Sequence, residues 1–247
     1  MLDFFVSLIL FICWILLYII SPYRSRRVSK RTHIKSPPIP RSKQYIWSMI
    51  DASCFGILAL LVAYLNQLTV FGQFHIDYRI FLLATGFLAL NMLFIEPLEW
   101  KYISDEIKQR YGSYSPHKAK EWFIWIAVSL ITAISEEILY RAVFFGIFYQ
   151  LTDNYWLAGL ISAVFFALAH WKYGLTALPS AFFVALGLQY FVRISGGLYV
   201  SITIHFFHNL VNGIVYGRIW KKKLRAEVTE QMIPNNREMA IKAQKIE

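Results

Sequence analysis

Apolar runs of about 20 residues recur along this chain and are separated by short polar or basic segments. A run of that length is enough to cross a bilayer as a helix. The short alternating segments typical of a transmembrane β-barrel are absent from the sequence. The pattern therefore predicts an all-α fold, a polytopic transmembrane helical bundle of about seven spans (six to eight). The predicted spans are 2–20, 45–72, 80–100, 122–150, 156–170, 175–192 and 198–217.

Composition supports this class and excludes an ordinary soluble domain. The 247 residues are 57% hydrophobic and 17% aromatic, with a mean hydropathy of +0.45. The first run carries Asp3 rather than basic residues at its start, and no small-residue cleavage pattern follows it, so we expect an uncleaved anchor. Cys13 and Cys54 both fall within apolar spans and predict neither a disulfide framework nor a metal site.

The net charge of +10 is distributed unevenly. In the seven-span arrangement, 22 of the 25 basic residues fall on one side of the membrane. By the positive-inside rule that side is the cytoplasm, which places the N-terminus outside and the C-terminus inside the cell. These segments are also expected to attract anionic membrane lipids. No nucleic-acid partner is expected, because no aromatic–basic stacking platform accompanies them. The basic segments are 21–43, the loop 101–121, Lys172 and the tail after Tyr216.

Three charges lie in the middle of one apolar span: Glu136, Glu137 and Arg141. A charge at the centre of a span costs about 2.5–3.5 kcal/mol even on lenient scales, so these residues must be paired, hydrated or functional. Glu137 and Arg141 are four apart and are predicted to form an ion pair, which would also serve a purely structural role. Glu136 points about 100° away and is freer to face a cavity.

Histidines in the following spans complete the candidate site. Glu136 lies about 16 residues before the hairpin at 151–155 and His170 about 17 after it, so both are predicted at the same depth, facing each other across a helix pair. His205 and Asn209 share one face of the last span. Their expected depth is nearer the outer end, a mismatch that shrinks if the helix 122–150 projects beyond the bilayer.

These residue types suit two kinds of chemistry. A carboxylate and a histidine can activate water for attack on a peptide carbonyl, and a histidine with an amide can stabilise the oxyanion. Glu136, His170 and His205 are also types that bind zinc, and the chemistry alone leaves both interpretations open. The motifs His-Glu-x-x-His, Gly-x-Gly-Asp and Gly-x-Ser-x-Gly of other intramembrane proteases are absent.

Three ordered motifs resemble a known family. Glu136-Glu137-Ile-Leu-Tyr-Arg141 fits Glu-Glu-x-x-x-Arg, Phe166-Ala-Leu-Ala-His170 fits Phe-x-x-x-His, and His205-Phe-Phe-His208-Asn209 fits His-x-x-x-Asn. In this order they resemble the CPBP family of CAAX prenyl proteases and bacteriocin-processing enzymes, also called the Abi family. The resemblance covers about residues 120–215.

The resemblance implies an intramembrane endopeptidase, often described in that family as a metalloprotease. It implies that Glu136 and His170 activate water, that His205 and Asn209 form the oxyanion site, and that Glu137 and Arg141 support them. It favours a metal-free, glutamate-type mechanism, so no cofactor is expected, and zinc is the alternative. The substrate would be a membrane-associated peptide or protein, either of CAAX type or a bacteriocin or pheromone precursor, and the location a bacterial cell membrane.

The chain then divides into four parts. These are a membrane anchor with a basic cytoplasmic linker (1–44), accessory transmembrane helices (45–120), a CPBP-like catalytic membrane core (121–217) and a basic cytoplasmic tail (218–247). Two other functions compete with the peptidase. One is a non-catalytic membrane protein of bacteriocin self-immunity, and the other is a transporter or channel, since buried acids and histidines also form proton paths.

Overall fold

The described part of the chain is built from helices. The structure, a computed structural model, describes residues 40–74 and 77–215. Within these ranges no strand occurs, and extended pairing is limited to a single antiparallel bridge between Gly72 and Gly197. Helices satisfy their own backbone hydrogen bonds, as a bilayer demands. The predicted all-α fold is confirmed for the described residues.

The helices follow one another with short connections. In chain order they are α2 (Arg41–Leu65), α3 (Tyr78–Leu90), π-helix η1 (Asn91–Ile95), α4 (Glu96–Tyr102), α5 (Asp105–Tyr114), α6 (Ala119–Glu137), π-helix η2 (Ile138–Phe144), α7 (Phe145–Thr152), α8 (Tyr155–Ala169), 3-10 helix η3 (Trp171–Tyr173) and α9 (Ala177–Ser195). A further helix covers 199–215, and we call it the 199–215 helix.

Four of the described helices are long and apolar enough to cross a membrane. They are Arg41–Leu65, Tyr78–Tyr102, Ala119–Thr152 and Ala177–Ser195, and Tyr155–Ala169 is a shorter apolar helix. The chain is therefore an integral membrane protein. The predicted span 2–20, the linker up to residue 39 and the tail 218–247 lie outside the described residues, and the predicted total of seven spans stays a prediction.

Two sequence-based boundaries need correction. The helix predicted over 45–72 runs instead from Arg41 to Leu65. It ends because Gln67 adopts a positive φ of 54° and the amide of Leu68 bonds back to the carbonyl of Ala63, a Schellman arrangement that stops a helix.

The predicted loop 101–121 contains helix α5. This helix is too polar to appear as an apolar run, and its end is held by packing: the ring of Tyr114 lies 5.2 Å from that of Tyr45 and 5.5 Å from that of Trp125. Tertiary contacts of this kind stabilise short helices that sequence periodicity does not reveal.

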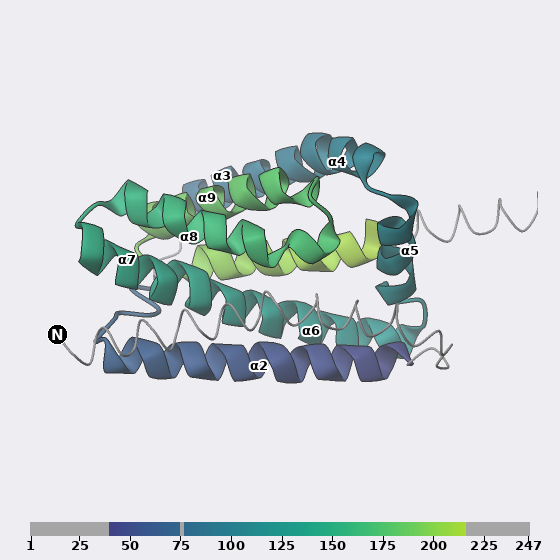
Figure 1. The fold of residues 1–247 in the computed structure, drawn as a ribbon, viewed down its shortest axis with the longest axis horizontal. Coiled ribbons are helices and arrows are strands. Elements are labelled where there is room, and N and C mark those ends of the chain that lie inside the picture. The colour runs from purple at the N-terminus through teal and green to yellow at the C-terminus, as the bar shows by residue number, and fades with distance from the viewer. Residues whose placement is uncertain (1–39, 75–76, 216–247) are drawn as a thin grey trace, which may run out of the picture.

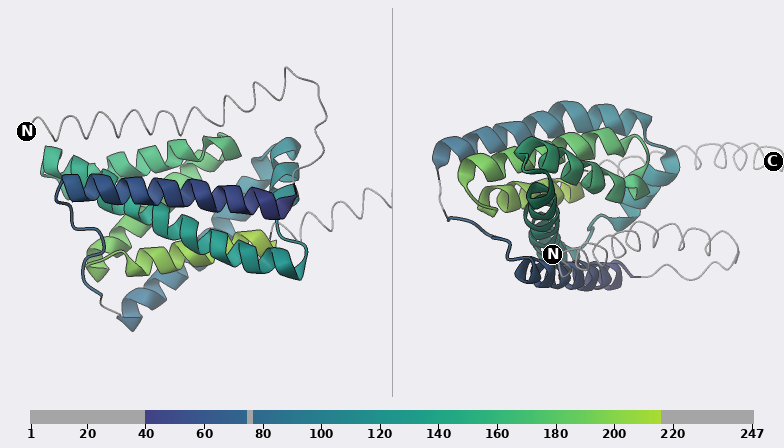
Figure 2. Two further views of the ribbon diagram at one scale, coloured as in Figure 1. Left: turned by 90° about the horizontal axis from the view of Figure 1, so that it is seen from below. Right: turned by 60° about the vertical axis from the view of Figure 1, so that its left-hand side comes forward.

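The helices pack against one another in layers. Helix α2 lies along α6 on one side of the bundle, and the α3–α4 helix lies on the opposite side, with α8, α9 and the 199–215 helix between them (Figures 1 and 2). The α2–α6 contact is close, because a Cβ added at Gly56 would lie 2.7 Å from the hydroxyl of Ser135.

Two apolar clusters hold these layers together. The larger joins α2, η2, α8 and α9 around Tyr140, Phe144 and Phe166. The smaller joins α3, α9 and the 199–215 helix around Leu188, Phe191 and Ile204. The 199–215 helix is thus packed beside both the helix that carries Glu136 and the helices that precede residue 120.

Candidate active site

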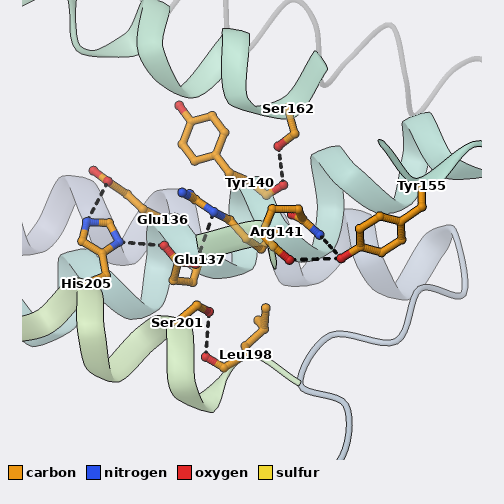
Figure 3. Close-up of polar contacts among 10 residues, drawn as sticks. Glu136, Glu137, Tyr140, Arg141, Tyr155, Ser162, Leu198, Ser201 and His205 are labelled. Carbon is orange, nitrogen blue, oxygen red and sulfur yellow. Dashed lines mark hydrogen bonds and ion pairs between the residues drawn. The ribbon is translucent and has the colours of Figure 1, made fainter. Parts of the chain in front are cut away.

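Glu137 and Arg141 form a buried ion pair at the start of the π-helical segment η2. Arg141 Nε lies 3.3 Å from Glu137 Oε2, and both side chains are excluded from solvent. The pair predicted from the spacing of four residues is confirmed. Glu136, the preceding residue, points to a different side and retains partial exposure, as its 100° offset predicts (Figure 3).

His205 lies between the two glutamates. Its Nδ1 is 2.7 Å from Glu137 Oε1 and its Nε2 is 3.6 Å from Glu136 Oε2, so one imidazole bridges adjacent carboxylates from a different helix (Figure 3). Because a carboxylate accepts, Nδ1 carries a hydrogen and donates it to Glu137. That bond fixes the ring orientation and aims Nε2 at Glu136.

This contact corrects the predicted depth of His205. The sequence placed His205 nearer the outer end of its span than Glu136, yet the two are within ion-pair range. The helix Ala119–Thr152 is 34 residues long, or about 51 Å, which exceeds the roughly 30 Å of hydrocarbon that a span must cross. A helix that long is tilted or projects, so counting residues from the hairpin overestimates the depth of Glu136.

The charges of the cluster balance when His205 is protonated. Glu136 and Glu137 then face Arg141 and the imidazolium, and the formal charges cancel. With a neutral ring, the lone pair of Nε2 would face the Glu136 carboxylate.

Phe166 connects the remaining site residues. Its ring stacks on that of His170 with centroids 4.4 Å apart, and contacts the ring of His205 edge-on at 6.1 Å. The guanidinium carbon of Arg141 lies 4.4 Å from the Phe166 centroid. The two terminal nitrogens of Arg141 are buried without a hydrogen-bond partner among the described residues, so this cation–π contact compensates part of their desolvation.

His170 ends α8 as predicted and caps it at the edge of the site. Its Nδ1 lies 2.8 Å from the carbonyl of Phe166, which can only accept, so Nδ1 carries the hydrogen. In the neutral ring Nε2 then has the lone pair and is the basic nitrogen. The structure brings Glu136 together with His205. His170 lies near them through Phe166, whose ring contacts both histidines. The direct facing of Glu136 and His170 stays a prediction.

Asn209 lies one turn after His205 on the 199–215 helix and is partly buried. The predicted sharing of one face by His205 and Asn209 therefore holds in the helix. Ser162, which the sequence did not single out, donates to the carbonyl of Tyr140 within η2 over 2.6 Å (Figure 3). It anchors α8 to the turn that follows the glutamates.

The alternative of a zinc site concerns Glu136, His170 and His205. Among residues 40–74 and 77–215, no three His, Cys, Asp or Glu side chains are grouped so that they could hold a metal ion. His205 Nδ1 is already engaged by Glu137, and Glu136, His170 and His205 form no such set.

One further acid was missed by sequence reasoning. Glu96 starts α4 inside the predicted span 80–100, and its carboxylate contacts His208. The signal was present, because a glutamate within an otherwise apolar run carries the same burial cost as Glu136. Its partner, three residues after His205, belongs to no motif position.

Comparison with known proteins supports the family resemblance. Residues 118–211 match the family model of type II CAAX prenyl endopeptidase Rce1-like proteins. The match includes Glu136, His170, His205 and Asn209 and confirms the resemblance inferred from the three motifs. No curated protein and no solved structure matches the chain.

Proposed function

We propose, on the premise that residues 118–211 are a domain of the Rce1-like type II CAAX prenyl endopeptidase family, that this membrane protease hydrolyses its substrate with a glutamate-activated water and without a metal. The family indicates an intramembrane endopeptidase of CAAX type that acts on membrane-associated substrates. The residue roles and the substrate are the proposal.

The reaction needs one water and returns every proton. The water oxygen attacks the carbonyl carbon of the scissile bond while Glu136, assisted by His170, takes a proton from the water. The oxyanion accepts hydrogen bonds from the Nε2–H of His205 and the amide of Asn209. When the C–N bond breaks, Glu136 returns the proton to the leaving amine.

One observation carries this assignment: His205 is held by Glu137 at Nδ1 while its Nε2 faces Glu136. A carboxylate that orients an imidazole and supports its charged form is a recurrent device of hydrolytic sites. Glu137 and Arg141 are thereby assigned supporting roles, and Glu136, with the longer contact, is the carboxylate that can exchange His205 for water.

The substrate is proposed to be a prenylated peptide of CAAX type, since the family model carries that description. A bacteriocin or pheromone precursor in a bacterial membrane is the other substrate class that the motifs suggest. The basic segment 101–121 and Lys172 support a cytoplasmic position for the ends of α4 and α8, with the N-terminus outside.

The test is cleavage of a farnesylated CAAX peptide by the full chain in detergent. Glu136→Gln keeps the size of the side chain and removes its basicity, so we expect cleavage to be abolished while membrane insertion stays normal. The control Asp51→Asn neutralises an exposed acid on α2 and is expected to cleave at the rate of the unchanged chain. Normal cleavage by Glu136→Gln would overturn the mechanism, and an immunity phenotype that survives this substitution would favour a non-catalytic immunity protein.

A further inference from the structure

A second glutamate–histidine pair lies outside the predicted site. Glu96 Oε1 is 2.5 Å from His208 Nε2 and 3.4 Å from the amide nitrogen of Asn212. Glu96 is buried. It belongs to none of the three motifs and precedes the residues that match the family model.

The proton positions in this pair follow from the chemistry of the groups. A carboxylate accepts, so His208 Nε2–H donates to Glu96, and the amide of Asn212 donates to the same oxygen. His208 and Asn212 are four residues apart and share a face of the 199–215 helix. Glu96 therefore holds one face of this helix at two successive turns.

The same helix carries the proposed oxyanion residues. His205 precedes His208 by three residues, and Asn209 precedes Asn212 by three. Residues three apart on a helix are offset by about 60° around its axis, so the pair His205 and Asn209 lies on the face next to that of His208 and Asn212. Glu137 of α6 holds His205 from one side, and Glu96, at the start of α4, holds His208 from another helix. Two carboxylates from different helices thus fix the rotation of a single helix.

The geometry makes that rotation critical. Side-chain tips lie about 5–6 Å from a helix axis, so a turn of roughly 20° would move them about 2 Å. That displacement would break the 2.7 Å contact between His205 and Glu137. A π-helical turn adjoins each of the two carboxylates. The turn Asn91–Ile95 ends directly before Glu96, and η2 begins directly after Glu137. Single π-turns change the phase of a helix and are frequent at functional sites.

We propose that Glu96 is a positioning residue of the peptidase site. Through His208 and Asn212 it sets the rotation of the 199–215 helix and so places His205 and Asn209 against the scissile carbonyl. This inference rests on the proposed function, and it gives the accessory helices a part in placing the catalytic residues.

The kinetic test compares two substitutions in the full chain with the farnesylated peptide. Glu96→Ala is expected to lower kcat per folded molecule by roughly ten- to a hundredfold, the effect of a misplacement near 1 Å, with KM unchanged. Glu96→Gln keeps an acceptor for His208 and is expected to restore most of kcat. The double variant Glu96→Ala with His208→Ala should be no slower than Glu96→Ala alone, because the two residues act as one unit.

A matched control is Glu99→Gln, an acid one turn further along the same helix, whose side chain hydrogen-bonds Ser180 and interacts with His208 through charge alone. It is expected to keep kcat near that of the unchanged chain. An unchanged kcat in Glu96→Ala, or a Glu96→Gln variant as slow as Glu96→Ala, would overturn the positioning role.

A second readout separates this inference from the peptidase proposal. Spin labels at Phe123→Cys on α6 and Phe207→Cys on the 199–215 helix, both exposed positions, report the setting of the helix when Cys13 and Cys54 are replaced by serine. Glu96→Ala should shift or broaden the measured distance distribution whether or not the peptide is cleaved. An unchanged distribution refutes the positioning role, whereas cleavage by Glu136→Gln refutes only the mechanism.

Discussion

Replacing Arg141 with methionine would leave Glu137 as a buried carboxylate without its cation. Both side chains are excluded from solvent and their charged atoms are 3.3 Å apart. At an effective dielectric constant of 20, two unit charges at that distance attract by about 5 kcal/mol. Removing one partner of a buried pair typically costs about 3–5 kcal/mol, because the other charge stays buried. We expect Arg141→Met to lower the free energy of unfolding by this amount.

The double variant Glu137→Gln with Arg141→Met provides the decisive comparison. It removes both charges, and replacing a whole buried ion pair is often close to neutral. The amide oxygen that Glu137→Gln introduces can still accept from His205 Nδ1 at the position of Glu137 Oε1. Stability should therefore recover most of what Arg141→Met loses.

Activity is expected to behave differently from stability in this series. A neutral amide supports the protonated form of His205 less than a carboxylate does, and loss of such an orienting partner commonly lowers activity roughly 10- to 100-fold. The double variant should thus be stable yet slow. Reversible unfolding in mixed detergent micelles, followed by tryptophan fluorescence, and peptide cleavage measure the two quantities. Equal stability of Arg141→Met and the unchanged chain, or a double variant no more stable than Arg141→Met, would refute the reasoning.

Two further predictions concern helix packing and metal dependence. Gly213→Ala places a methyl group against the Trp125 indole, so we expect a loss of about 1–3 kcal/mol of stability by overpacking. The control Gly86→Ala, at a position open to its surroundings, should be neutral or stabilising by up to about 1 kcal/mol. Equal thermal stability of the two variants would contradict this packing. Prolonged dialysis against a zinc chelator should leave peptide cleavage unchanged, and loss of activity that added zinc restores would show that the proposed metal-free mechanism is wrong.

The parts of the site fixed by the geometry of a single helix were predictable from the sequence. The spacing of four residues predicted the Glu137–Arg141 pair, and the offset of 100° predicted that Glu136 faces another side. The long apolar helices followed from the apolar runs, and the hairpin between α7 and α8 lies within the predicted 151–155.

Contacts between helices were harder to predict from the sequence. That His205 reaches both glutamates depends on the tilt of a 34-residue helix and on the rotation of the 199–215 helix, which apolar periodicity does not specify. The π-helical turns Asn91–Ile95 and Ile138–Phe144 shift the phase of their helices without a sequence signature. The Glu96–His208 pair joins residues 112 positions apart, and only the burial cost of Glu96 hinted at a partner.

The three glutamates near the histidines, Glu96, Glu136 and Glu137, differ in exposure and in contact distance. Glu137 is fully buried at 2.7 Å from His205, and the side chain of Glu96 is 10% exposed at 2.5 Å from His208. Glu136 is 19% exposed and its contact with His205 is 3.6 Å. A general base must release its partner and meet water, whereas an orienting carboxylate must do neither. The longest contact and the largest exposure therefore favour Glu136 as the base, with Glu137 and Glu96 as the two fixed supports of the histidines it works beside.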